Sequence, residues 1–333
     1  MITKYKIKTL EEKEYPEWNN LVDNSPNGTI FHKSWWLKAS GRDFVIYGYF
    51  REKKLYAGIA FCFKKILQFR IASHPPLTPY SGILFMKQNL KYVNKLSETK
   101  QITTEIVSKI KNDFSSIAFS FFPGTVDLQP FIWKGFSTSI GYTYIINLDK
   151  DLDEIWNNMS SKTKNHIRKA EKDGICVIET NNFNSGFNMV KKTFKRQNKK
   201  TYFESVAHKY DKILKKKKQS RWFIATKPNG KAVAAIYIAW DNKKSYQLLA
   251  GYDQNKYNRG SVAFAIWKAI QFSKKKLGLN QYDFEGSMLP EIEKFFRKFG
   301  GDLTSYYTVN WSPCPLRGLF YIKKIIKNSL LKF

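Results

Sequence analysis

The fold of this chain is decided by residues 246–301, which read YQLLAGYDQNKYNRGSVAFAIWKAIQFSKKKLGLNQYDFEGSMLPEIEKFFRKFGG. The apolar residues 246–253 predict a β-strand, and the polar loop after it ends in Gly260. The elements predicted to follow are a helix at 261–278, a strand at 281–286 and a short helix at 290–299. Backbone amides at the start of a helix can hold an anionic group, so we predict the active centre in this stretch.

The composition is that of a globular protein. The chain has 333 residues, 43% of them hydrophobic and 16% aromatic, which is enough for two ordinary domains with real cores. The cysteines Cys62, Cys176 and Cys314 are scattered and odd in number, so they predict neither a disulfide framework nor a zinc site. The four histidines have no nucleophile motif and no metal-ligand spacing, so we expect no catalytic triad and no metal.

The net charge of +30 is carried mostly by lysine and has two interpretations. A lysine-rich surface attracts polyanions such as tRNA or an anionic membrane leaflet. Abundant Lys, Asn, Ile and Phe are also typical of proteins from AT-rich genomes. The N-terminus lacks the apolar core of a signal peptide, and the longest apolar run, residues 232–240, falls far short of the ~20 residues that span a bilayer. We therefore expect a cytoplasmic protein, with peripheral contact to the inner face of the membrane as an option.

The two halves of the chain repeat one order of predicted elements. The first half reads as a hairpin at 44–50 and 56–65, a strand at 80–85, a helix at 91–112, a strand at 117–122, a short helix at 130–136 and a strand at 138–148. The second half reads as a hairpin at 221–226 and 232–240, followed by the elements of residues 246–301 and a strand at 304–310. Two copies of one mixed α/β module explain this order.

The predicted fold class is therefore α/β, in the α+β sense, with two tandem domains. Each domain is expected to be a mixed, mostly antiparallel sheet flanked by helices. The predicted boundaries are 1–148 for the first domain, 149–312 for the second and 313–333 for a basic amphipathic C-terminal helix. We expect the second domain to bind the donor and to carry the chemistry.

Three local motifs carry a family resemblance. They are KTKNHIRKAEKDGI at 162–175, DFEGSMLPEIEKFFRKFGG at 283–301 and TIFHKSWWLKAS at 29–40. Together with the element order, they resemble the GNAT superfamily of acyltransferases. The tandem arrangement resembles the Fem family, the aminoacyltransferases that build peptidoglycan cross-bridges, and their acetyltransferase-like relatives. The resemblance implies an acyl or aminoacyl transfer to an amine.

One position departs from the family pattern. The resemblance implies a lysine after the first aromatic residue of an F-K-x-x-F-G segment in members that use aminoacyl-tRNA. Here that position is Phe296, and Arg297 and Lys298 point elsewhere on a helix, because each residue turns it by about 100°. The departure favours a thioester donor, acyl-CoA or an acyl carrier, over charged tRNA.

Acyl transfer needs a held donor and groups that move protons. The residues predicted to hold the donor's phosphates are Lys256, Asn258, Arg259, Gly260 and Ser261. A plain strand–helix connection, with a turning glycine and Ser261 as N-cap, has the same appearance. As catalytic residues we predict Asp253 and Glu285, at the ends of the strands flanking the long helix, and Tyr252 as a proton donor to the leaving group. The alternative is that these acids cap turns or pair with lysines, and that Tyr252 packs in a core.

An anionic acceptor, such as a nucleotide-linked or lipid-linked sugar, needs cationic ligands. The predicted ligands are Lys33, Lys38, Lys162, Lys164 and Arg168. A solvated basic helix is the alternative interpretation for the last three. In the tail, residues 315–333, five apolar residues share one helical face, which fits either an anionic membrane surface or packing on the tail's own domain.

The predicted function is acyl or aminoacyl transfer from a thioester to an amine of a cell-envelope precursor or similar acceptor. No tightly bound cofactor is expected, since the donor is a co-substrate. The first alternative is an aminoacyl-tRNA-dependent transferase of the peptidoglycan type. The second is a non-catalytic basic module that binds RNA or anionic membrane.

Overall fold

The structure, a computed structural model, describes residues 5–254 and 260–313 and divides into two compact units. The first unit reaches to Ile140 and takes in the described residues from Tyr306 onward; the second is Gly141–Ser305. The unit boundaries fall inside two long strands, β7 (Ser137–Asn147) and β13 (Asp302–Trp311), instead of after residues 148 and 312. Each of these strands begins in one unit and ends in the other, which element order alone does not reveal.

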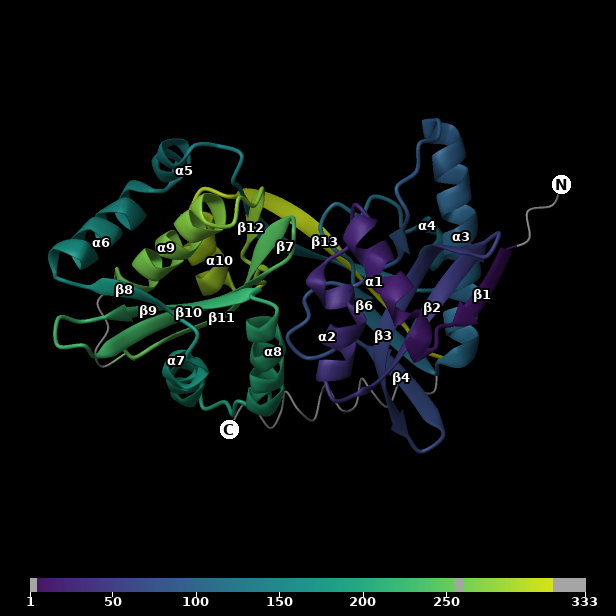
Figure 1. Ribbon diagram of the computed structural model, residues 1–333, viewed down its shortest axis with the longest axis horizontal. Helices are drawn as coiled ribbons and strands as arrows, with labels where there is room; N and C mark the ends of the chain where they lie inside the picture. The colour runs from purple at the N-terminus through teal and green to yellow at the C-terminus, as the bar shows by residue number, and fades with distance from the viewer. Residues whose placement is uncertain (1–4, 255–259, 314–333) are drawn as a thin grey trace. The chain divides into compact units, whose positions relative to one another are not determined.

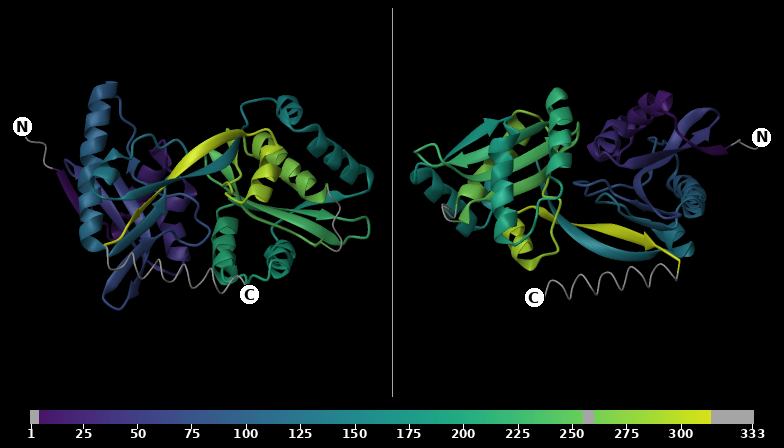
Figure 2. Two further views of the ribbon diagram at one scale, coloured as in Figure 1. Left: turned by 180° about the vertical axis from the view of Figure 1, so that it is seen from behind. Right: turned by 90° about the horizontal axis from the view of Figure 1, so that it is seen from below.

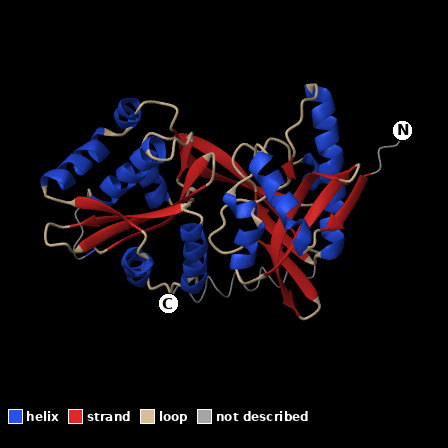
Figure 3. Cartoon of the chain, in the orientation of Figure 1, coloured by secondary structure: helices blue, strands red, loops and turns tan. Residues whose placement is uncertain are grey.

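The first unit is a mostly antiparallel sheet with helices on both faces (Figures 1 and 3). Its elements are β1 (Tyr5–Thr9), α1 (Tyr15–Asn24), α2 (Ser34–Ala39), β2 (Asp43–Arg51), β3 (Lys54–Ile66), β4 (Phe69–Ser73), β5 (Leu84–Phe85), α3 (Tyr92–Asp113), β6 (Ser116–Ser120) and α4 (Gln129–Trp133), with 3₁₀ turns at Glu12–Glu14 and Ile30–His32. The strand order is β1-β2-β3-β4-β6-β13, with β5 on β3. Only the β4–β6 ladder is parallel among the pairings described in this unit.

Neighbouring residues of β2 show how the two faces are covered. Ile46 packs in a cluster with Trp18 of α1, whereas Tyr47 packs in a second cluster with Ile106 of α3. Successive strand residues point to opposite faces, so α1 and α2 cover one face of the sheet and α3 and α4 cover the other. Figure 1 shows the long α3 on one side and α1 and α2 on the opposite side.

The strand predicted at 80–85 is mostly absent, and a different strand occupies its place in the sheet. Only Leu84–Phe85 forms a short β5, while β4 at Phe69–Ser73 pairs antiparallel with β3 and parallel with β6. The sequence prediction was wrong here because the prolines that follow led us to assign the whole segment up to Thr78 to a loop. The prolines begin only after β4 has ended.

The second unit is a sheet of order β7-β12-β11-β10-β9-β8. Its elements are α5 (Leu152–Asn158), α6 (Ser161–Lys172), β8 (Cys176–Thr180), α7 (Phe183–Arg196), α8 (Glu204–Lys216), β9 (Ser220–Thr226), β10 (Ala232–Trp240), β11 (Lys244–Tyr252), α9 (Ser261–Lys275), β12 (Gln281–Asp283) and α10 (Pro290–Arg297). Ser160 caps α6 by accepting a hydrogen bond from the Thr163 amide, and Gly174 follows the helix at a φ of 75°. The β11–β12 ladder is parallel.

Two adjacent residues of β9 define the layers of the second unit. The Trp222 ring lies against Gly186 of α7, while Phe223 packs on Phe272 of α9 at 5.4 Å between ring centroids. Hence α7 and α9 cover opposite faces of the sheet. Helices α5, α6 and α10 share the core cluster of α9, and Figures 1 and 2 show α8 on the same face as α7.

The two units use the same pairing scheme. In each, the central strand (β4 or β11) is antiparallel to the hairpin strand before it and parallel to the strand after the long helix. This confirms the predicted α/β class built from two related modules. No helix among the described residues is long and apolar enough to cross a membrane.

Candidate functional site

The parallel strands β11 and β12 part after a very short ladder. Their described pairing comprises three residue pairs and ends at Tyr246 opposite Asp283. Beyond this point the chain of β12 stays with β7, since the Phe284 amide donates to the Tyr144 carbonyl over 3.1 Å. Strand β11 continues for six more residues, to Tyr252. The edge of β11 that faced β12 is thus free of that partner over its second half.

Asp283 and Glu285 lie where the strands part. Asp283 is fully buried and accepts hydrogen bonds from the Thr143 hydroxyl at 2.7 Å and from the Glu285 amide at 2.8 Å. Glu285 has a φ of 58°, a left-handed conformation that non-glycine residues rarely adopt. Strand β12 ends at Asp283, so the alternation of side chains along a strand does not extend to Glu285.

The surroundings of Glu285 favour the neutral form of its carboxyl group. Burial raises the pKa of its carboxyl well above the ordinary value, and the neighbouring Asp283 carboxylate raises it further. The Oε1 atom of Glu285 is buried and has no hydrogen-bond partner among the described residues. The hydroxyl of Tyr282, also buried, donates to Gln247 Oε1 at 2.7 Å, and burial raises its pKa as well. A neutral carboxylic acid with an uncommitted oxygen is suited to donating a proton or a hydrogen bond.

Asp253 and Tyr252 occupy the far end of β11 and contact α7. Asp253 is 8% exposed, and Lys192 Nζ lies 2.7 Å from its Oδ2. The Tyr252 amide donates to the Thr193 hydroxyl at 2.9 Å, and the Arg196 guanidinium lies 4.2 Å above the Tyr252 ring. The end of β11 is therefore surrounded by cationic groups of α7.

The register separates the predicted catalytic residues into two groups. Asp253 is seven residues beyond Tyr246, about 23 Å along an extended strand, while Glu285 is only two residues beyond Asp283. The strands are neighbours, but their register places Asp253 and Glu285 at different levels along the sheet.

The N-terminus of α9 is tightly packed. Gly260 is its N-cap, and a Cβ at this position would lie 1.9 Å from the His166 carbonyl oxygen of α6. Close helix packing by itself thus accounts for the glycine. Ser261 is the first helical residue rather than the cap; it is fully buried, and its Oγ has no hydrogen-bond partner among the described residues. The predicted donor ligands Lys256, Asn258 and Arg259 lie outside the described residues, as do Cys314 and the tail.

The basic helix α6 crosses α9 at Gly260, so the structure brings these two predicted groups together within one unit. Lys162 is exposed and has no ion-pair partner among the described residues, and Lys164 Nζ donates to the Asn157 carbonyl at 3.3 Å. Arg168 lies with its guanidinium 5.5 Å above the Trp156 ring. Lys162 and Lys164 therefore remain candidates for holding an anion.

The predicted acceptor ligands of the first unit already have partners. Lys33 is mostly buried, pairs with Asp23 at 2.5 Å and donates to the Asn19 carbonyl at 2.9 Å. Lys38 pairs with Glu12 at 2.7 Å on the surface. The contacts of Lys33 join α1 to the start of α2, which indicates a structural role for this residue.

Phe296, the departure from the family pattern, is a core residue. It is 9% exposed, and its ring centroid lies 4.8 Å from that of Phe284. Arg297 contacts Glu293 with its Nε at 3.4 Å, on the same helix. Position 296 therefore has an apolar core side chain where the family pattern has a lysine.

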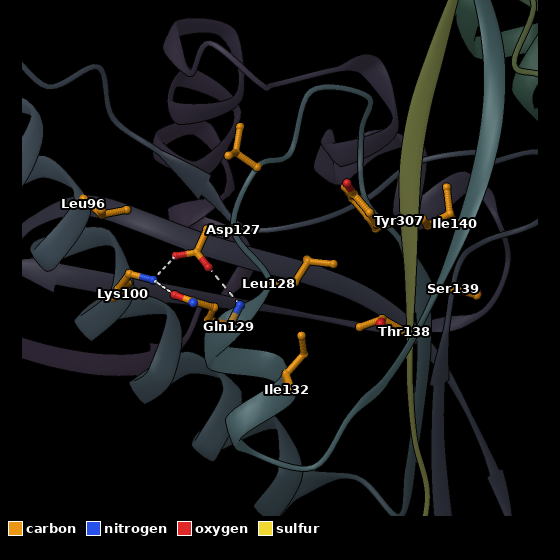
Figure 4. A pocket seen from close by; sticks show the side chains of 11 residues that line it. Leu96, Lys100, Asp127, Leu128, Gln129, Ile132, Thr138, Ser139, Ile140 and Tyr307 are labelled. Carbon is orange, nitrogen blue, oxygen red and sulfur yellow. Dashed lines mark hydrogen bonds and ion pairs between the residues drawn. The ribbon is translucent and has the colours of Figure 1, made fainter.

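A cavity of about 800 Å³ in the first unit lies apart from all of the predicted site residues. Its walls are mainly apolar, from Leu96, Leu128 and Ile132, and its cation Lys100 pairs with Asp127 at 2.6 Å and also donates to Gln129 (Figure 4). With its charge neutralised, this cavity offers no free acid, base or anion ligand.

Sequence reasoning missed Lys192, Thr143 and Tyr282. Lys192 meets Asp253 across 61 residues of chain, and Thr143 meets Asp283 across 140. No local pattern could have paired them. Tyr282 immediately precedes the motif at 283–301, and its place beside Asp283 was the available signal.

Comparison with known proteins places this arrangement among solved folds. No protein-family model and no curated protein matches the chain. The crystal structure of FemX is similar over 91% of this chain and 96% of its own, with a TM-score of 0.68 and 15% identity. The structure of L-PGS from Bacillus licheniformis is similar over 95% of this chain and 97% of its own, with a TM-score of 0.58 and 12% identity. A tandem GNAT protein from the clavulanic acid biosynthesis pathway is similar over 93% and 99%, with a TM-score of 0.57 and 8% identity. The chain thus has the Fem-like, tandem GNAT fold.

Proposed function

We propose that the chain transfers an acyl or aminoacyl group from a thioester to an amine, at the place in the second unit where β11 and β12 part. The likeness in fold to FemX and to a tandem GNAT protein supports the reaction class. The donor and the position of the reacting atoms are argued from the geometry of the second unit.

The separation between Glu285 and the far end of β11 carries the proposal. We assign the donor's phosphates to the backbone amides and the Ser261 hydroxyl at the start of α9, because the Ser261 Oγ has no hydrogen-bond partner among the described residues. Glu285 lies two residues beyond Asp283, near the point where the β11–β12 pairing ends. A phosphopantetheine arm has about thirteen chain bonds between phosphorus and sulfur, a little more than four extended residues. Its phosphate end and its thioester end can therefore lie at different parts of β11.

The free edge of β11 supports the same donor. A strand edge without a partner can hydrogen-bond an extended chain that carries amides. A pantetheine arm has two amides. It can therefore lie along β11 with its phosphates at α9 and its thioester beside Glu285.

Glu285 serves as a proton shuttle in this account. The amine nitrogen bonds to the thioester carbonyl carbon, and the carbon–sulfur bond breaks. Neutral Glu285 gives its proton to the departing thiolate and then takes one from the nitrogen, so that no net proton is consumed. Asp253 and Tyr252 act at the phosphate end of the donor and not at the reacting carbon.

The proposed binding site for the acceptor is argued from positive charge. Lys162 and Lys164 of α6 lie on the helix that packs against the start of α9, so an anionic acceptor would find cations there. A nucleotide-linked or lipid-linked amine of the cell envelope has the required chemistry. We therefore propose such an amine as the acceptor class.

Thermal shift with a CoA thioester tests the proposal, with Ser261→Ala as the variant. In the free protein this change removes a buried hydroxyl without a partner, so we expect an unchanged or slightly raised Tm. A lost hydrogen bond to a charged phosphate is worth about 1.5–3 kcal/mol, so CoA affinity should fall about 10- to 100-fold. A shift with charged tRNA but none with CoA thioesters would refute the thioester donor, and a shift with neither would refute the reaction.

A further inference from the structure

The outer surface of α7 and α8 is the most concentrated positive region of the second unit. Residues 191–218 contain twelve lysine or arginine residues and two acids, a net of ten positive charges that makes up one third of the chain's +30. Both acids are already paired, Glu204 with Lys191 and Asp211 with Lys215 at 2.7 Å. The remaining charge is not compensated within the segment.

The uncompensated lysines point away from the sheet. On α8, Lys209, Lys212 and Lys216 are spaced i, i+3 and i+7, so they form one exposed stripe, while Tyr210 and Leu214 are buried against the sheet. Lys195 of α7 and Lys199 and Lys200 of the loop that follows are also exposed. None of these six lysines has an ion-pair partner among the described residues. We call them the α7–α8 lysine face.

An aromatic side chain stands within this basic surface. Tyr202, between α7 and α8, is 85% exposed and follows Lys199 and Lys200 closely in the chain. An exposed tyrosine beside lysines is typical of membrane interfaces, where its ring enters the headgroup region and its hydroxyl stays wet. Contact with a membrane would explain the exposure of Tyr202, which is part of neither the core nor the candidate site.

The type of cation distinguishes a membrane from a nucleic acid. Arginine is preferred for nucleic-acid phosphates because its planar fork binds them in two places. The one arginine within residues 191–218, Arg196, lies over the Tyr252 ring at 4.2 Å. The α7–α8 lysine face contains lysines alone, which act as point charges on flexible stems and suit the diffuse charge of an anionic lipid surface.

We propose that the α7–α8 lysine face docks the protein on an anionic phospholipid membrane, with Tyr202 entering the interface. The same helix α7 contacts the end of β11 through Lys192 and Thr193, so docking would bring this part of the second unit close to the lipid headgroups. The docking does not depend on the reaction proposed above.

Vesicle co-sedimentation of the full chain tests this docking. The vesicles are phosphatidylcholine alone or with about 30 mol% phosphatidylglycerol, at about 0.1 and 0.5 M salt. The test variant is Lys209→Gln/Lys212→Gln/Lys216→Gln. The matched control is Lys54→Gln/Lys64→Gln/Lys65→Gln, which removes the same charge from exposed positions on β3 of the first unit. Circular dichroism verifies that both variants are folded.

We expect wild-type binding to the anionic vesicles alone, weakened by salt. Each lysine near an anionic surface is worth about a factor of five, so the test variant should lose on the order of a hundredfold in partition coefficient, and the control no more than a few-fold. Tyr202→Ser should lose several-fold at both salt concentrations, because its contribution is burial rather than charge.

Three results would overturn the docking. They are no binding of the wild type to anionic vesicles at low salt, an equal loss in the control, and unchanged vesicle binding in the test variant. A titration with an RNA hairpin in the same buffer accompanies the vesicle assay. If the test variant loses RNA binding while its vesicle binding is unchanged, the α7–α8 lysine face binds RNA and not the membrane.

Discussion

The substitution Glu285→Gln gives a quantitative test of the half-buried acid where β11 and β12 part. Glutamine has nearly the same shape but cannot ionise, so it removes one titration and little else. The pKa of Glu285 is raised well above its ordinary value in the folded protein, first by burial and then by Asp283. The unfolded chain has the ordinary value of about 4.3.

The sign of the effect follows from proton binding. Below the ordinary pKa both states hold the proton, and Glu285 has no effect on the pH dependence. Between the ordinary and the raised pKa, only the folded state holds it, so the wild type loses stability as pH rises. The slope is about 1.4 kcal/mol per pH unit. Relative to the wild type, Glu285→Gln therefore gains this amount with every pH unit in that window.

The measurement is the Tm difference between variant and wild type at steps of half a pH unit from pH 4 upward. For a unit of this size, about 1.4 kcal/mol corresponds to about 3–6 °C, so the difference should grow by that much per pH unit above about pH 4.5. All other titrating groups cancel in the difference. Glu291→Gln, on the exposed first turn of α10, controls for the loss of one negative charge. Parallel Tm curves for Glu285→Gln and wild type would refute a raised pKa of the Glu285 carboxyl.

Three further predictions concern single positions. Gly260→Ala should destabilise the second unit by about 1–3 kcal/mol, seen as a lower Tm, because its Cβ would lie 1.9 Å from the His166 carbonyl; an unchanged Tm would contradict the close packing of α6 on α9. Phe296→Lys should cost about 3–5 kcal/mol in unfolding free energy, because the Phe296 ring packs on Phe284, and it should confer no transfer from aminoacyl-tRNA. A stable variant that transfers from aminoacyl-tRNA would show instead that the residue at position 296 decides the donor. In the native protein, maleimide should label exposed Cys176 but not Cys62, since burial raises the pKa of the Cys62 thiol to about 11; rapid labelling of Cys62 would show that its site opens.

Local sequence patterns predicted most of the second unit. The period of residues 261–278 predicted α9, and the hairpin predicted at 221–226 and 232–240 corresponds to β9 and β10. Each of these elements depends on contacts between residues that are close in sequence, and such contacts can be recognised from local sequence patterns. The first unit was predicted less well, because a short strand before a proline-rich loop has too few residues to show a period, and β4 was assigned to the loop.

The candidate site was predictable in its residue types but not in its geometry. Asp253 and Glu285 each follow the end of a strand, yet their separation depends on the register between β11 and β12. That register is set by contacts between residues far apart in sequence. The raised pKa of Glu285 likewise depends on burial by distant side chains and on Asp283, and no local sequence pattern indicates it.

Hydrogen–deuterium exchange with a saturating CoA thioester tests the central claim most directly, because it locates the donor without requiring the acceptor. The account predicts slower exchange in the second half of β11, Leu248 to Tyr252, and in the first turn of α9 from Ser261, with deacylated tRNA giving no such protection. Unchanged exchange in both segments, or protection confined to the first unit, would contradict a thioester site between β11 and β12.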